Sequence, residues 1–251
     1  ILLMKKEFVY IQEISQKEKC PLQNHIKLSE NKKIIELLKT KSSTKQEVYR
    51  ITQSVFKDLN KVLKKKVEQM SSQMQNHDNS VEIEFNPKGD FETQIKFSGD
   101  VLIFHMHSNI FDFPPSHEIH KTSYVKEDKY RSFCGVIHIY NFLSDSLKYN
   151  RLNDVGHLIG RIFVNKESHY FVEGEKQLGF LYNDFVNQTI NSEKLDEIID
   201  SSILFTLNFD LHIPKFNDVS LVNVHQILEM NSNQKLQTSK SLGFKFSYEN
   251  K

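Results

Sequence analysis

The chain has 251 residues, which is enough to bury a substantial hydrophobic core in one large domain or two small ones. Its formal net charge of +1 at pH 7 excludes a strong overall field that would steer the protein onto nucleic acid or an anionic membrane. The two cysteines, Cys20 and Cys134, form no CxxC pair, which excludes the common zinc-binding and dithiol redox motifs.

The rest of the composition favours a cytoplasmic, bacterial protein. There is no alanine, Lys outnumbers Arg, and Asn, Ile and Phe are abundant, as expected from an AT-rich genome. No apolar run reaches the roughly 18 residues that a membrane span requires, and the apolar residues ahead of Met4 are too few for a signal peptide. We therefore expect no membrane span, no export and two reduced thiols.

Residues 1–79 predict a helical N-terminal segment. After a break near Pro21, a short helix is expected to begin at Ser29, a typical N-cap residue, and to end in the polar stretch before Thr44. Thr44 and Glu47 then form a capping box ahead of a long amphipathic pattern. A helix of about 30 residues spans roughly 45 Å. It is therefore expected either to lie across a sheet or to pack against a second copy in a homo-oligomer.

Residues 80–251 predict a β-rich domain with one or two helices. The alternation of apolar and polar residues indicates strands at 81–85, 91–97, 101–107 and 134–143, and a hairpin over 160–174 with its turn at Asn165–Ser168. The long polar stretch 112–133 contains two adjacent prolines and predicts an irregular loop of the kind that is often functional.

The C-terminal part predicts helix, strand, helix and strand in turn. A helix capped by Ser192 is followed by residues 203–213, where apolar residues alternate with mostly polar ones and indicate a strand. The stretch 220–230 favours a helix, and 242–248 favours a closing edge strand. Together these segments predict an α+β fold, in which one long amphipathic helix precedes a mainly antiparallel sheet of about seven to nine strands, open or curled into a barrel or sandwich.

Two histidines lie in the third predicted strand, within GDVLIFHMHSNIFDF, residues 99–113. Residues two apart in a strand share a face, so His105 and His107 are expected to point to the same side. Two imidazoles about 7 Å apart at the backbone can converge on one metal ion. A metal site needs further ligands, and the candidates are Asp112, His117, Glu118, His120 and His138.

This stretch resembles the first half of the cupin metal motif. Gly99, His105 and His107 stand at the spacing of that motif, with Asp112 in the place of its usual Glu. A site of this kind would place His105, His107, Asp112 and His138 around Zn or Fe. The closing glycine of the motif and its second half, with a Pro, a Gly and a third His, are not found in this sequence.

The sequence favours a non-catalytic module. In this interpretation an aromatic-rich curved sheet and the long loop bind a protein partner or a small ligand, while the long helix mediates assembly. The alternative is a metal-dependent enzyme with His105, His107 and His138 around Zn or Fe, and with Asp112 or Glu118 as the fourth ligand or general base.

Nucleic-acid binding is less favoured. The basic run Lys61–Lys66 has no interleaved aromatic residue and indicates a solvated helix face. Asp100 with Glu127 and Lys129 matches the letters of a carboxylate–lysine nuclease core, but Glu127 lies in polar loop sequence. Glycine-rich phosphate-binding loops are absent.

Overall fold

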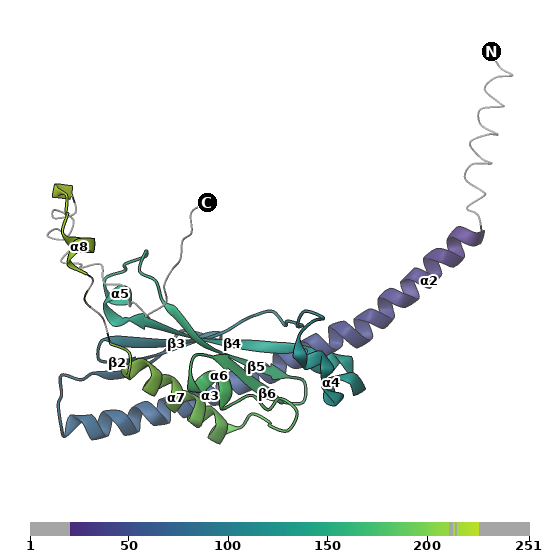
Figure 1. Ribbon diagram of the computed structural model, residues 1–251. Helices are drawn as coiled ribbons and strands as arrows, with labels where there is room; N and C mark the ends of the chain where they lie inside the picture. The colour runs from purple at the N-terminus through teal and green to yellow at the C-terminus, as the bar shows by residue number, and fades with distance from the viewer. Residues whose placement is uncertain (1–20, 211–212, 214, 226–251) are drawn as a thin grey trace, which may run out of the picture. The chain divides into compact units, whose positions relative to one another are not determined.

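The computed structural model describes residues 21–210, 213 and 215–225. The chain divides into two compact units, Ile1–Gln46 and Glu47–Lys251, and Figure 1 labels most of the described helices and strands. The boundary between these units falls between Gln46 and Glu47 and does not coincide with the predicted boundary at residue 79. The predicted division into a helical segment and a β-rich domain stays a prediction.

Helical backbone runs without a break from Pro21 to Gln75. It consists of α2 (Pro21–Leu37), a π-helical stretch η1 (Leu38–Ser42) and α3 (Ser43–Gln75). The predicted helix start at Ser29 and the predicted stop before Thr44 were therefore wrong. Helix α2 is described from Pro21 onward, so helical backbone already includes residues 21–28 ahead of Ser29. The hydroxyl of Thr44 donates to the carbonyl of Thr40 one turn earlier, so this polar residue continues the helix instead of capping a new one.

Six strands form one antiparallel sheet in the order of the sequence. They are β1 (Ile83–Pro87), β2 (Glu92–Phe97), β3 (Asp100–Met106), β4 (Cys134–Leu143), β5 (His157–Asn165) and β6 (Tyr170–Gly174). The α+β class, the three consecutive strands, the strand at 134–143 and the later hairpin are confirmed. Within the described part of the chain the sheet has six strands instead of seven to nine, and it does not close into a barrel.

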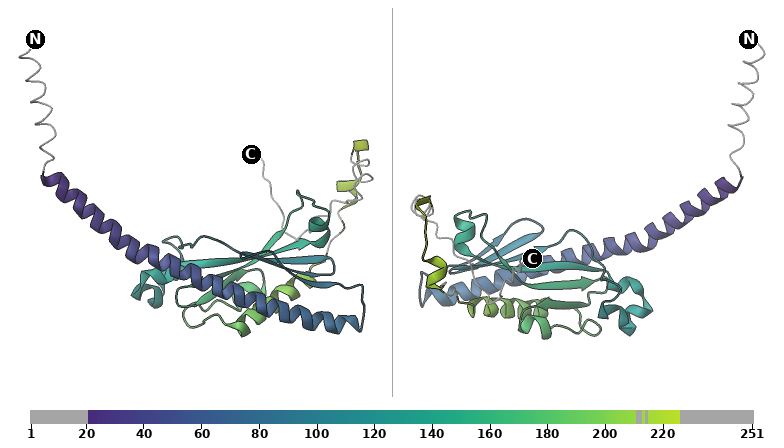
Figure 2. Two further views of the ribbon diagram at one scale, coloured as in Figure 1. Left: turned by 180° about the vertical axis from the view of Figure 1, so that it is seen from behind. Right: turned by 45° about the horizontal axis from the view of Figure 1, so that its top comes forward.

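One face of this sheet is covered by α3 and by α7 (Ser192–Leu207), as the two views of Figure 2 show. Phe56, Leu59 and Leu63 of α3 pack in the main core with Ile198 and Ile199 of α7. The sheet contributes its inward-facing residues, among them Leu102, Phe104, Ile137, Ile139 and Ile162. The length of α3 thus matches a helix that lies across its own sheet.

Helix α7 replaces the strand that the sequence predicted at 203–213. Residues 203–207 are its C-terminal part, and the described residues 208–210 and 213 form no strand. The buried residues of α7 recur at three-and-four spacing, and packing on the main core favoured this period over the alternation of Ile203, Phe205 and Leu207. The N-cap is Asn191, whose side chain accepts a hydrogen bond from the amide of Lys194, rather than Ser192.

The other face of the sheet carries the long segment between β3 and β4. This segment contains η2 (Glu118–Lys121), α4 (Ser123–Glu127) and η3 (Lys129–Ser132), so the expected irregular loop is partly helical. Ile119, Tyr124 and Val125 pack with residues of the sheet in a second, smaller core, which also includes Phe163, Phe171 and Phe185. The segment is therefore folded onto the sheet.

The remaining elements are short: α5 (Ser144–Lys148), α6 (Gln177–Phe180) and α8 (Phe216–Val219). The predicted edge strand at 242–248 and most of the predicted helix at 220–230 lie outside the described residues. Among the helices that the structure describes, none combines the length and the apolar character that a bilayer span requires.

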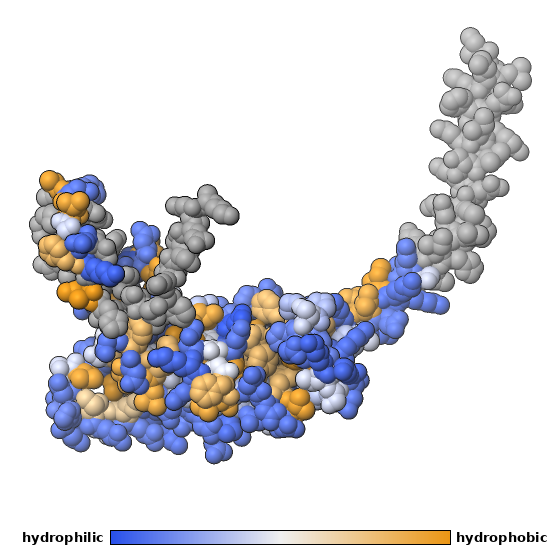
Figure 3. All heavy atoms as spheres, in the orientation of Figure 1, coloured by the Kyte–Doolittle hydropathy of each residue, from blue (hydrophilic) through white to orange (hydrophobic). Residues whose placement is uncertain are grey.

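Polar residues cover the outward side of α3, along the lower edge of the molecule in Figure 3. The exposed lysines there include Lys57, Lys61 and Lys64. Lys66 is an exception, because its ammonium group forms ion pairs with Asp196 and Asp200 of α7. One residue of the basic run therefore joins two helices, while its neighbours are solvated as predicted.

Candidate functional site

A row of polar residues crosses the face of the sheet opposite α3 and α7. The strand register pairs Glu92 with His105, His105 with His138, His138 with Arg161, and Arg161 with Glu173. Directly paired residues of antiparallel strands point to the same face. The row therefore places one polar side chain from each of the strands β2 to β6 side by side.

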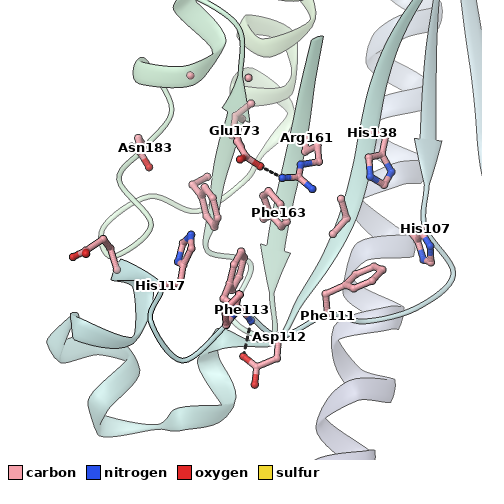
Figure 4. Close-up of a pocket in the computed structure, with 17 residues that line it drawn as sticks. His107, Phe111, Asp112, Phe113, His117, His138, Arg161, Phe163, Glu173 and Asn183 are labelled. Carbon is pink, nitrogen blue, oxygen red and sulfur yellow. Dashed lines mark hydrogen bonds and ion pairs between the residues drawn. The ribbon is translucent and has the colours of Figure 1, made fainter. Parts of the chain in front are cut away.

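A cavity of about 800 Å³ lies between one end of this row and the long segment after β3 (Figure 4). Its walls combine phenylalanine rings, imidazoles and one arginine–glutamate ion pair. The residues that carry the site are His138 from β4, Arg161 and Phe163 from β5, Phe171 and Glu173 from β6, and His107, Phe111, Phe113 and His117 from the segment after β3.

Aromatic rings form a continuous apolar surface in the cavity. The rings of Phe163 and Phe171 are stacked with centroids 4.7 Å apart, and the ring of Phe113 lies 5.3 Å from the first and 5.7 Å from the second. His117 stacks on Phe113 at 4.6 Å. These separations are typical of favourable aromatic pairs.

The imidazoles of His107 and His138 lie together at the other side of the cavity, with ring centroids 6.3 Å apart. The amide of Asn109 donates to Nδ1 of His107 at 2.9 Å, which leaves Nε2 as the nitrogen that holds the proton. Burial lowers the pKa of His138, and the nearby charges of Arg161, His107 and His105 lower it further. His138 is therefore a neutral imidazole at pH 7.

Arg161 and Glu173 form an ion pair at the edge of the cavity, through Nη2 of the arginine. The arginine side chain is 38% exposed and that of Glu173 is 57% exposed. The guanidinium also lies over the ring of Phe163, 5.3 Å from its centroid. An ion pair this exposed contributes little to stability, so its partners can separate at low cost.

The structure brings together some of the predicted metal ligands and separates others. His105, His107 and His138 lie on one face of the sheet, although His105 is not among the residues that line the cavity. Asp112 lies at the opposite rim, where its carboxylate accepts hydrogen bonds from the amide of Phe113 and the hydroxyl of Ser132 (Figure 4).

The further metal-ligand candidates have other partners. Glu118 forms an ion pair with Lys121, and Nε2 of His120 is 3.1 Å from the carbonyl oxygen of Phe113. In the part of the chain that the structure describes, no group of three or more His, Cys, Asp or Glu side chains is arranged to hold a metal ion. The Zn or Fe site at His105, His107, Asp112 and His138 stays a prediction.

The nuclease-like sequence pattern leads to no site in the structure. Asp100 begins β3 at the end where it pairs with Leu143, whereas Glu127 lies in α4, close to the beginning of β4. Asp100 and Glu127 thus lie at opposite ends of the β3–β4 pair.

Cys134 is a fully buried free thiol, and burial raises its pKa, so it is not an activated nucleophile.

Arg161, Glu173 and the phenylalanine surface were not identified from the sequence. A signal was present, because Arg161 and Glu173 are charged positions in otherwise apolar stretches of a predicted hairpin. Their alignment with His138 depends on the pairing of β4 with β5, which no local pattern specifies.

Comparisons of the chain with protein-family models, with curated proteins and with solved structures find no match.

Proposed function

We propose that the chain is a non-catalytic binding module whose cavity holds a small organic ligand with a planar apolar part. The observation that supports this proposal is the cavity of about 800 Å³ with aromatic walls and a few convergent polar groups. Volumes of roughly 300–1,000 Å³ and this kind of lining are typical of small-molecule sites. A concave site favours a small ligand over the protein partner that the sequence left open.

The cavity also has a rigid wall on the side away from the sheet. The segment after β3 is held by the second core and by the backbone hydrogen bonds between Phe111 and Cys134, both 2.9 Å long. Several of these residues also line the cavity, and their contacts with one another hold the segment on the sheet. A site that is formed before binding loses little conformational entropy when the ligand arrives, which raises affinity.

Protein-observed NMR with a mixed set of aromatic fragments tests this proposal. Fragments are expected to shift the amide resonances of His107, His138, Phe163 and Phe171 in the full chain. Phe111→Ala should weaken their binding by about tenfold, because it removes one aromatic wall. Phe180→Ala is the matched control, since Phe180 is exposed and does not line the cavity. Fragments that shift no cavity resonance, or that bind both variants equally, would contradict the proposal.

The metal-dependent enzyme remains the second hypothesis from the sequence. It predicts stoichiometric Zn or Fe in the purified protein, measured by elemental mass spectrometry, and loss of that metal in the double variant His105→Ala, His107→Ala. His77→Ala is the control, because His77 is exposed in the turn after α3. Metal-free protein that still binds aromatic fragments would reject the enzyme and leave the binding module. A cytoplasmic location likewise stays part of the proposal.

A further inference from the structure

Arg161 is the cationic side chain that lines the cavity, and Glu173 is its ion-pair partner. Within the described residues, the hydrogen bond between them uses Nη2 of the guanidinium alone. The other guanidinium donors form no hydrogen bond to a described side chain or carbonyl. Because Glu173 lies on the edge strand β6 with a largely exposed side chain, it can move into solvent without disturbing the core.

The other carboxylates at the cavity have partners of their own. Asp112 is held by Ser132 and by the amide of Phe113, and Figure 4 shows its carboxylate pointing away from the aromatic rings. Glu118 pairs with Lys121. Among the described residues, Glu173 is therefore the carboxylate that is paired with Arg161.

The neighbours of Arg161 reinforce this anion position. His138 is its register partner, and the ring of His107 lies beside that of His138. An anion bound to Arg161 would therefore also lie beside the ring of His138. A single arginine without a lysine or a helix N-terminus matches a group with one negative charge better than it matches a phosphate.

We propose that the ligand is a small aromatic carboxylic acid, whose carboxylate replaces Glu173 on Arg161 and contacts His138 while its ring packs on Phe163, Phe171 and Phe113. This inference rests on the proposed function and specifies its ligand class. In this proposal Glu173 is an internal placeholder: its carboxylate pairs with Arg161 until the carboxylate of the ligand takes its position.

Matched acid and amide probes test the ligand class. Benzoate and 2-naphthoate are titrated into the full chain beside benzamide and 2-naphthamide, which have the same shape and no charge. The acids are expected to bind about tenfold more tightly than the amides, because charge-assisted hydrogen bonds to arginine are stronger than neutral ones. Equal affinities for acids and amides, or no binding of the acids in the cavity, would overturn the inference.

Charge variants test the placeholder role of Glu173. Glu173→Gln should raise the affinity for 2-naphthoate by about threefold, since the competing carboxylate is gone, and leave 2-naphthamide unchanged. The double variant Arg161→Gln, Glu173→Gln should remove the preference for the acid while keeping the net charge. Lys194→Gln with Glu197→Gln is the matched control, because this pair lies on α7 outside the cavity. Weaker binding of the acid by Glu173→Gln would contradict the proposal.

These outcomes separate the two proposals. If amides and acids bind equally and Phe111→Ala weakens both, the binding module stands and the carboxylic-acid class is rejected. If neither probe pair binds and the wider fragment set also leaves the cavity resonances unshifted, the proposed function fails as well.

Discussion

Asn165, at the end of β5, ties the segment after β3 to the sheet. Its side chain is fully buried, and its Nδ2 donates to the hydroxyl of Tyr124 at 2.9 Å and to the carbonyl of Arg131 at 3.2 Å. Its Oδ1 accepts from the amides of Glu167 and His169, both at 2.9 Å. Both ends of the amide are thus satisfied, so burial of this polar group carries no unpaired donor or acceptor.

Replacing Asn165 should weaken the attachment of the segment after β3 to the sheet. Asn165→Ala leaves four former partners without their hydrogen bond, and we expect the free energy of unfolding to fall by about 2–3 kcal/mol. Urea denaturation measures the change. Asn187→Ala is the control, because the exposed side chain of Asn187 has Asp184 as its hydrogen-bond partner among the described residues, and it should cost less than about 0.5 kcal/mol. Equal effects of the two substitutions would show that the buried network does not stabilise the fold.

His138 should make stability depend on pH. Because its pKa in the folded protein lies below the ordinary value of 6.5, the unfolded chain binds the proton at higher pH than the folded one. The free energy of unfolding therefore falls as the pH drops through 6.5, and this loss ends below the folded pKa. We expect His138→Gln to lose less stability than the parent chain in urea denaturation between about pH 7.5 and about pH 5.

The control for this measurement is His77→Gln, at an exposed histidine outside the sheet, which should lose as much stability as the parent chain. An unchanged loss in His138→Gln would assign the pH dependence to other groups.

At the scale of elements, the position of α3 on the sheet depends on close contact between a helix residue and a glycine. A Cβ added to Gly135 of β4 would lie 2.1 Å from Oγ1 of Thr52 and 2.7 Å from its Cβ. Thr52 is fully buried, and its hydroxyl donates to the carbonyl of Val48 at 2.8 Å, so it cannot swing away. Glycine is favoured at position 135 because the side chain of Thr52 packs directly on the strand there.

Gly135→Ala should therefore push α3 away from β4 and lower the free energy of unfolding by about 1–3 kcal/mol through overpacking. Gly99→Ala is the matched control, since a Cβ at Gly99 meets no atom within 4 Å. Combining Gly135→Ala with Thr52→Ala should cost less than the sum of the two single changes, because Thr52→Ala removes two of the three atoms with which the new Cβ would clash. Additive losses in thermal or urea denaturation would contradict the close packing.

At the scale of the whole molecule, the two faces of the sheet have different roles. One face is closed by α3 and α7 and forms the main core, while the other combines a small core with an accessible cavity. The sequence attributed a homo-oligomer to the length of the helix at 44–74, but the apolar side of α3 is buried in its own chain. Among the residues of the helical segment whose burial is described, the exposed large aliphatic residues are instead Ile34, Ile35, Leu37 and Leu38.

We therefore keep the homo-oligomer as a prediction and expect it to depend on these residues of α2 and η1. Light scattering at micromolar concentration should give a mass of about twice 29.5 kDa. Ile34→Glu with Leu38→Glu should return the chain to a monomer, because charges on this side of the helix prevent apolar contact. Lys33→Glu is the control in the same helix. A monomer in the parent chain would reject the prediction.

Local periodicity determined the parts of this protein that depend on neighbours in sequence. The change from a helical to a two-residue period near residue 80 predicted β1 to β4 and the β5–β6 hairpin, and it placed His105 and His107 on one face. It failed at 203–207, where alternating apolar residues fit a strand but the contacts with the main core selected a helix.

The tertiary structure alone decided the site. Strand pairing aligned His138 with Arg161 and Arg161 with Glu173. The β-bridge between Phe111 and Cys134 placed Phe111, and packing on the second core placed Phe113. Register and loop packing depend on the summed contacts of residues far apart in the sequence, which no short pattern contains. The sequence by itself thus determined which strands and helices form and which histidines share a face, whereas their partners in the cavity were set by long-range packing.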